Sequence, residues 1–154
     1  MADIEINVGI GEPFLGCIGE GWIRRVVTET LVMEGAGSPV ELGVVVADDK
    51  TVRQLNREYR DEDEPTDVLA FALREDGEGT FVNPPDGMLH LGEVVISYPR
   101  AVAQAREHGH PLRRELALLL VHGVLHLLGY EHDTPEGERA MRSAEERVLG
   151  VLTP

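Results

Sequence analysis

Three histidines in the C-terminal third of the chain have the spacing of metal ligands. His122 and His126 are four residues apart, which on a helix places both imidazoles on one face about 5–6 Å apart, close enough to bind one ion. Gly129 can end such a helix in the left-handed conformation, and His132 follows three residues later, where it can face the same ion. The spacing therefore predicts a metal site made by His122, His126 and His132.

Three protein ligands leave one coordination position for water, which is the arrangement of catalytic zinc sites. Bound Zn²⁺ lowers the pKa of that water to about 7 and polarises a carbonyl or phosphoryl oxygen beside it. We therefore expect one Zn²⁺ per chain, with another divalent metal as the alternative, and hydrolytic chemistry. A helical pair of histidines can also be two ordinary core residues, and it is the addition of Gly129 and His132 that favours a metal.

The same spacing occurs in the metzincin proteases, whose signature is His-Glu-x-x-His-x-x-Gly-x-x-His. Position 123 departs from it, because Gly stands where those proteases have the Glu that activates the attacking water. Another base could come from elsewhere, for example Glu115, whose more ordinary role is a surface carboxylate or one that holds a metal ligand. A metallopeptidase or amidohydrolase is therefore an alternative prediction.

The elements that would position these histidines mix strands and helices. Residues 112–128 are apolar around most of a helix circumference, which predicts a central, buried helix that carries His122 and His126. Asp48 or Asp49 is expected to cap a further helix. Apolar alternation and β-branched runs predict strands over residues 4–10, 40–47, 67–73 and 91–97, and helical periodicity predicts helices over 22–33, 51–59, 100–107 and about 134–149.

Length and composition restrict the class of protein. The 154 residues are enough for one hydrophobic core, so we expect a single domain over residues 1–154. No apolar stretch is long enough for a membrane span and the N-terminus lacks a secretory signal, which predicts a cytoplasmic protein. The single cysteine, Cys17, cannot form an intramolecular disulfide and is expected to be a small core residue. The net charge of −14 argues against a protein that coats nucleic acid irrespective of sequence.

The segment from His122 to Asp133, HGVLHLLGYEHD, resembles the metal-binding signature of the bacterial YbeY family, endoribonucleases of ribosomal RNA maturation. Two further segments agree, in the same order as in the family. Residues 55–71, LNREYRDEDEPTDVLAF, are similar to its Leu-Asn-x-x-Tyr-Arg and Asp-x-Pro-Thr-Asp/Asn-Val-Leu-Ser-Phe motifs, and residues 91–97, LGEVVIS, to its Gly-Asp-Ile-x-Ile-Ser strand. The resemblance covers roughly residues 40–150.

This resemblance implies a single α+β domain with a mixed β-sheet and a metal-assisted hydrolase. The implied function is a metal-dependent, single-strand-specific endoribonuclease in small-subunit ribosomal RNA maturation and ribosome quality control. The expected partners are single-stranded and ribosomal RNA, the small ribosomal subunit and its assembly factors, with no membrane. By matching positions, His122, His126 and His132 are the metal ligands, and the catalytic residues are His122 and Arg60, the cation near the cleft.

Arg60 suits that position chemically, because a planar guanidinium can bind two non-bridging oxygens of a phosphodiester as negative charge develops on them. Its alternative role is a salt bridge to the adjacent acidic residues 61–64. The sequence does not identify the general acid, for which Tyr130, Glu131 and Asp133 are all nearby.

This chain departs from the family pattern at a few positions. Glu62 stands where the family often has Lys, which lowers the positive potential next to Arg60, while Glu93 replaces an Asp and Ala70 a Ser. The remaining basic residues could form an RNA-facing strip or a solvated helix face; they are Arg100, Arg106, Arg113 and Arg114, with His108 and His110 between them. A third hypothesis is a ribosome-assembly adaptor with a structural metal, whose acidic surface docks on basic ribosomal proteins.

Overall fold

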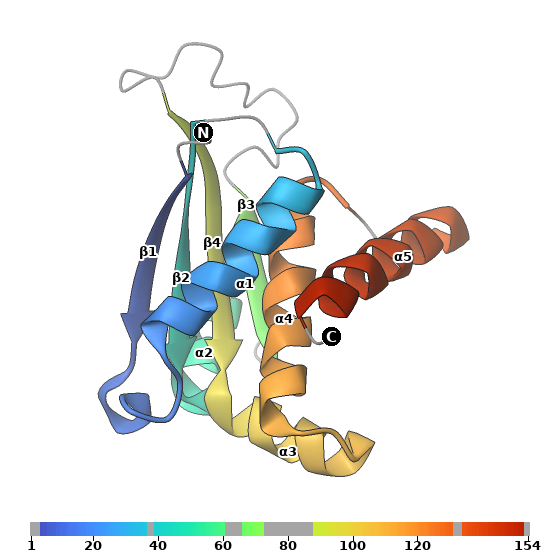
Figure 1. The fold of residues 1–154 in the computed structure, drawn as a ribbon. Helices are drawn as coiled ribbons and strands as arrows, with labels where there is room; N and C mark the ends of the chain where they lie inside the picture. Colours follow the sequence, from blue (N-terminus) through green and yellow to red (C-terminus); the bar gives the residue numbers. More distant parts are fainter. Residues whose placement is uncertain (1–3, 37–38, 61–65, 73–87, 131–133, 153–154) are drawn as a thin grey trace.

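A computed structural model describes residues 4–36, 39–60, 66–72, 88–130 and 134–152, with the backbone alone for residues 59 and 60 (Figure 1). Its strands are β1 (Ile4–Ile10), β2 (Val40–Ala47), β3 (Val68–Ala72) and β4 (Leu89–Ser97). Its helices are α1 (Glu20–Met33), α2 (Asp49–Arg60), α3 (Tyr98–His108), α4 (Leu112–Leu127) and α5 (Pro135–Leu152), and a short 3₁₀ turn, η1, spans Glu12–Phe14.

The four strands form one mixed sheet in the order β1-β2-β4-β3. β1, β2 and β4 are parallel, and the edge strand β3 is antiparallel to β4. The central strands carry uninterrupted apolar runs, 44–46 in β2 and 94–96 in β4, which is typical of parallel strands buried on both faces. The predicted α+β class with a mixed sheet is confirmed.

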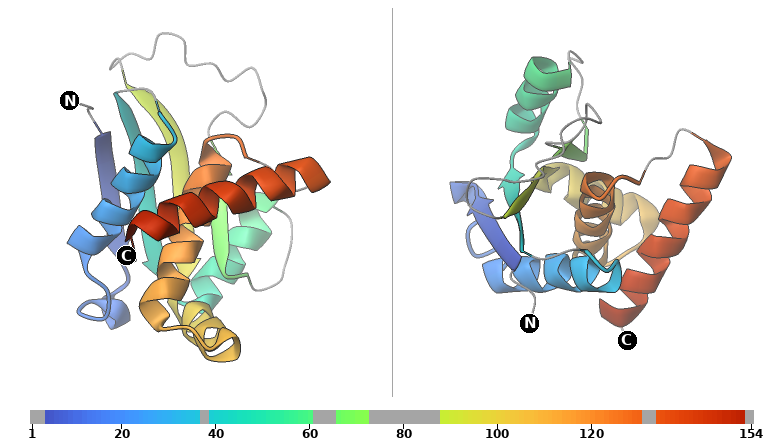
Figure 2. Two further views of the ribbon diagram at one scale, coloured as in Figure 1. Left: turned by 45° about the vertical axis from the view of Figure 1, so that its right-hand side comes forward. Right: turned by 90° about the horizontal axis from the view of Figure 1, so that it is seen from above.

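Helices cover both faces of this sheet. Successive strand residues point to opposite faces, so Val44 and Val94 belong to the main core, while Val95 packs with Val52 of α2 in a second, smaller cluster. Figure 2 shows α2 on the opposite side of the sheet from α1 and α4, and α5 packed across α4. His122 and His126, which α4 carries, therefore lie on the same side of the sheet as α1.

Helix α4 is the central helix that the sequence predicts. Most of its residues are buried, including Leu116, Leu120 and Val124, and it packs against the sheet and three other helices. Its approach to β4 is closest at Gly123, where an added Cβ atom would lie 2.6 Å from Cγ1 of Val94. Glycine at position 123 is therefore required by the packing of α4 on the sheet. No helix among the described residues is long and apolar enough to span a membrane.

Two local expectations are decided by the structure. Cys17 is exposed, so its prediction as a core residue is wrong. The reason is local, because Gly16 turns the chain with φ +89° and the larger apolar neighbour Ile18 takes the buried position. Of the two residues expected to cap α2, Asp48 is the one that does so, because its Oδ1 accepts a hydrogen bond from the Thr51 amide at 2.7 Å. The acidic run 61–64 lies outside the described residues.

Candidate metal centre

His122 and His126 lie one turn apart near the C-terminal end of α4. Their ring centroids are 4.7 Å apart and the ring planes make an angle of 79°. The two imidazoles therefore share a helix face, as the spacing of four residues predicts. The His122 side chain is 31% exposed, which leaves this face accessible from solvent.

A carboxylate from another helix holds the ring of His122. Oε2 of Glu145, on α5, lies 2.6 Å from Nδ1 of His122. Metal-binding histidines commonly have such a partner on the nitrogen that does not bind the ion, because it sets the tautomer and the ring orientation. With Nδ1 engaged, Nε2 is the nitrogen of His122 that can bind a metal.

Sequence analysis missed this role of Glu145, which is one of many charged residues in the last helix. Its placement follows from the apolar face of α5, where Met141, Ala144 and Val148 are buried in the main core. Because Glu145 is four residues after Met141 and three before Val148, it lies beside them on the helix face that docks, and the carboxylate reaches α4. A search for acidic residues beside the apolar face of α5 could have found it.

The turn after α4 is tied to two other helices. Gly129 has φ +106°, the left-handed conformation expected of a residue that ends a helix. The hydroxyl of Tyr130 donates a hydrogen bond of 2.5 Å to Glu34 at the end of α1, and Arg147 of α5 binds the other oxygen of Glu34 at 3.1 Å. The hydrogen bond to Glu34 raises the pKa of Tyr130. The proton of Tyr130 is thus engaged by Glu34, which disfavours this residue as the general acid.

The other predicted site residues are only partly described. His132 lies outside the described residues, as do Glu131 and Asp133. Arg60 is the last residue of α2, and its side chain is not described. The assignment of His122, His126, His132 and Arg60 to catalysis and metal binding stays a prediction.

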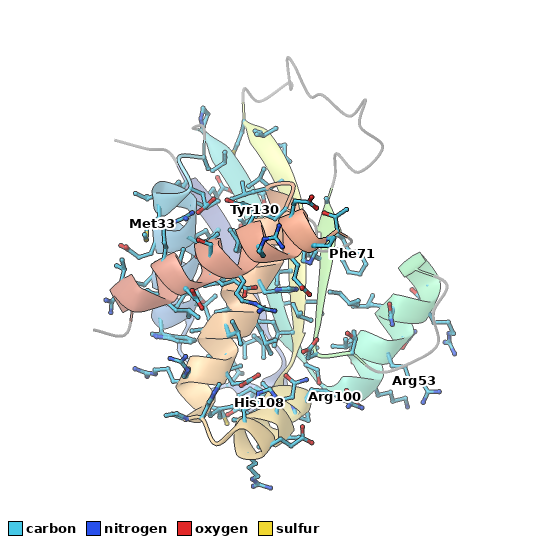
Figure 3. All side chains as sticks on the ribbon, turned by 90° about the vertical axis from the view of Figure 1, so that its right-hand side faces the viewer. Met33, Arg53, Phe71, Arg100, His108 and Tyr130 are labelled. Atoms are coloured by element: carbon cyan, nitrogen blue, oxygen red, sulfur yellow. The ribbon has the colours of Figure 1, made fainter. Side chains whose placement is uncertain are left out.

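A second group of possible metal ligands lies at the other end of α4. Glu115 is 1% exposed, and its Oε1 lies 3.3 Å from Nδ1 of His108 and 3.3 Å from Nδ1 of His110. Glu115 is therefore no surface carboxylate, and it is seven residues, about 10 Å along the helix axis, from His122. Figure 3 shows His108 at the end of α4 opposite to Tyr130. At that distance Glu115 does not act as a base beside His122.

Several members of the expected basic strip have partners inside the protein. Arg100 forms a 3.2 Å ion pair with Asp49 of α2, and the guanidinium of Arg113 lies 5.3 Å from the ring centroid of Trp22. With the contacts of His108 and His110 to Glu115, four of the six residues of the expected strip have partners inside the protein. An RNA-facing strip on these residues stays a prediction, as does the alternative of a solvated helix face.

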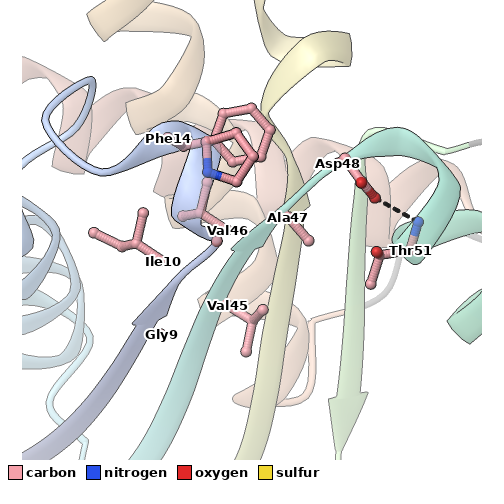
Figure 4. A pocket seen from close by; sticks show the side chains of 10 residues that line it. Gly9, Ile10, Phe14, Val45, Val46, Ala47, Asp48 and Thr51 are labelled. Carbon is pink, nitrogen blue, oxygen red and sulfur yellow. Dashed lines mark hydrogen bonds between the residues drawn. The ribbon is translucent and has the colours of Figure 1, made fainter.

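A pocket of about 370 Å³ lies elsewhere, where β1 and β2 end (Figure 4). Its lining is mostly apolar, and its polar members, Asp48 and Thr51, are hydrogen-bonded to each other in the cap of α2. It contains none of the predicted site residues. The histidines of α4 therefore stay the better candidate for a reaction centre.

Comparisons with known proteins show which family this chain belongs to. The family model described as "Endoribonuclease YbeY" matches residues 19–153. The chain belongs to the YbeY family. The YbeY endoribonuclease of Roseiflexus castenholzii is 45% identical over 152 residues, covering 98% of this chain and 94% of that protein. That of Pelotomaculum thermopropionicum is 48% identical over 152 residues, covering 99% and 95%. The solution structure of TM1509 from Thermotoga maritima is similar at a TM-score of 0.59 and 26% identity, covering 97% of this chain and 91% of that one.

YbeY membership confirms the predicted function at the level of a metal-dependent endoribonuclease in ribosomal RNA processing. Neither the metallopeptidase or amidohydrolase hypothesis nor the adaptor hypothesis is supported. The structure adds a physical reason against a metzincin-like peptidase. A Glu at position 123 would collide with Val94, so α4 has no room for the protease base.

Proposed function

We propose that this YbeY-family protein is a zinc-dependent endoribonuclease that cuts single-stranded RNA during small-subunit ribosomal RNA maturation and ribosome quality control. Its partners are ribosomal RNA, the small ribosomal subunit and its assembly factors, and its location is the cytoplasm. The observation that carries the proposal is the 2.6 Å contact of Glu145 with Nδ1 of His122, beside His126 on the same helix face. A carboxylate behind one of two adjacent imidazoles is the support that metal-binding histidines require.

The donor groups suit zinc. Imidazole nitrogens are among its preferred ligands, and three of them leave a position for water. His122, His126 and His132 would hold the ion through ring nitrogens, with Glu145 keeping His122 in the orientation that presents Nε2. When bound, zinc supplies a water of lowered pKa and a Lewis acid for the phosphoryl oxygen.

Arg60 supplies the second positive charge of the proposed mechanism. Cleavage of a phosphodiester places negative charge on its non-bridging oxygens, and a guanidinium can donate two parallel hydrogen bonds to them. A chain with a net charge of −14 repels RNA at long range. Binding of the phosphate therefore depends on local positive charge, which the metal and Arg60 provide.

The test is cleavage of end-labelled single-stranded RNA by metal-stripped protein, with and without added zinc. We expect zinc to restore cleavage in the wild type and His126→Ala to reduce it by about 10³-fold or more, because the metal contributes several kcal/mol to transition-state stabilisation. His90→Ala is a matched control, since His90 is also bound to a glutamate, Glu41, but lies in the sheet. Full cleavage by a His126→Ala protein that carries no metal would overturn the proposal, and equal cleavage of double-stranded RNA would overturn the strand specificity.

A further inference from the structure

Three side chains with metal-binding atoms meet where α3 ends and α4 begins, and we call them the α3–α4 cluster: His108, His110 and Glu115. One ligand atom from each lies within 4.8 Å of the others. Gly109, with φ +69°, reverses the chain between the two histidines, and Glu115 follows in the first turn of α4. Local chain geometry thus brings all three side chains together.

The distances in the α3–α4 cluster differ from those of other His–Glu contacts in the protein. Nδ1 of both histidines lies 3.3 Å from the same oxygen, Oε1 of Glu115. The contacts His122–Glu145 and His90–Glu41 measure 2.6 and 2.7 Å, near the usual 2.7–2.9 Å of charge-assisted hydrogen bonds. Two ligands at about 2.0–2.1 Å from a tetrahedral zinc ion stand about 3.3–3.4 Å apart. The spacing therefore fits ligands that share one ion better than it fits two short hydrogen bonds.

Burial gives an independent reason for a cation at this place. The Glu115 side chain is 1% exposed, and Nδ1 of His110 is buried without a hydrogen-bond partner among the described residues. Nδ1 of His108 lies within hydrogen-bond distance of the buried carboxylate, at 3.3 Å. Burial of the carboxylate and of the unsatisfied ring nitrogen of His110 still costs free energy, and an ion bound between them would offset that cost. The side chains of His108 and His110 are 50% and 30% exposed, so an ion can enter from solvent and keep bound water.

We propose that the α3–α4 cluster is a second divalent-metal site, with zinc as the ion. Its ligands are Nδ1 of His108, Nδ1 of His110 and the carboxylate of Glu115, and water completes the coordination. The ion would join the last residue of α3 to the first turn of α4 and so stabilise that junction. Because Glu115 lies about 10 Å along α4 from His122, this site is separate from the proposed catalytic centre and does not depend on it.

The test is a zinc titration of metal-stripped full-length protein by isothermal calorimetry. We expect two equivalents for the wild type and for the His90→Ala control, one for His126→Ala and one for the double variant His108→Ala/His110→Ala. Zinc should raise the melting temperature of His126→Ala, since an ion that binds only the folded state stabilises it. The shift should disappear when all three substitutions are combined. Both histidines of the α3–α4 cluster are partly exposed, so their replacement leaves the core intact.

Two results would overturn the second site: a His126→Ala protein that binds no zinc, or a double variant that still binds two equivalents. A wild type that binds one equivalent, lost only in the double variant, would keep the second site and refute the proposed catalytic centre. The two proposals therefore fail separately.

Discussion

The two ends of α4 use the same residue types in different arrangements. At the C-terminal end, Glu145 lies behind His122, at 2.6 Å from the ring nitrogen that does not face the proposed metal. At the N-terminal end, Glu115 lies between His108 and His110, at 3.3 Å from each. The position of the carboxylate decides the role that we propose for it: behind a histidine it would orient a metal ligand, and between two histidines it would be a ligand itself.

The two ends also differ in how the chain assembles them. The α3–α4 cluster is local, because its members lie within eight consecutive residues around one turn. The contact of Glu145 with His122 joins residues 23 positions apart and forms only when α5 docks on α4. The C-terminal end is therefore sensitive to helix packing, while the N-terminal end depends mainly on the turn at Gly109.

The largest effect is expected between the two ends, at Gly123. Gly123→Glu would complete the protease signature, but its side chain would collide with Val94 and bury a charge. We expect the free energy of unfolding to fall by about 3 kcal/mol or more, with no gain of peptidase activity, as measured by urea denaturation and a peptide-library assay. Gly150→Glu on α5 is the control, because a Cβ there meets nothing within 4 Å, and it should change stability by about 1 kcal/mol or less. A Gly123→Glu protein as stable as the wild type would contradict the close approach of α4 to β4.

A smaller effect is expected at Glu145, and it should be confined to one end of α4. Glu145→Gln removes the charge that orients His122, so zinc affinity at the C-terminal end and RNA cleavage should each fall about 10–100-fold. The α3–α4 cluster should still bind one equivalent of zinc. Glu146→Gln is the control, because that neighbouring side chain is exposed. Wild-type zinc affinity at both ends of α4 in Glu145→Gln, or an equal loss of zinc affinity at both ends, would contradict a role of Glu145 at the C-terminal end alone.

Much of this architecture could be predicted from the sequence because local patterns decide it. The β-branched run in β2 and the apolar circumference of α4 give elements whose bounds agree with the structure to within a residue. The pair His122 and His126 follows from helix geometry alone, since residues four apart share a face. The predicted helices, strands and histidine pair are correct where the periodicity of the side chains along the chain determines the local structure.

Contacts between distant elements could not be predicted in this way. Glu145 is one of several acidic residues of α5, and only the docking of that helix selects it. The Glu34 that binds Tyr130 is the residue that follows α1, 96 positions away. Glu115 was expected at a surface or beside a metal ligand, and the sequence does not show that α3 packs against α4, the helix in which Glu115 is buried. The sequence shows which face of each helix is apolar, but not which other element that face packs against.

The smallest effect is expected on the far face of the sheet, at the cap of α2, where neither end of α4 is involved. Hydrogen bonds from Thr51 hold the pKa of the Asp48 carboxyl below its ordinary value of 3.8. A group whose pKa is lowered by folding stabilises the protein at pH values above its ordinary pKa. This stabilisation is lost as the pH falls through the lowered pKa. Asp48→Asn keeps a capping side chain but does not titrate.

At pH 7 the wild type should therefore be more stable than Asp48→Asn by about 0.3–1 kcal/mol, from the charge at the helix N-terminus. The effect is small because Asp48 is exposed and solvent screens it. Urea unfolding should show the difference shrinking as the pH falls below 3.8, while zinc titration at pH 7 shows the wild-type number of equivalents. A constant difference across this pH range would mean that the Asp48 charge does not stabilise α2. A lost zinc equivalent would mean that the sheet couples its two faces, so that neither end of α4 could be treated as independent of α2.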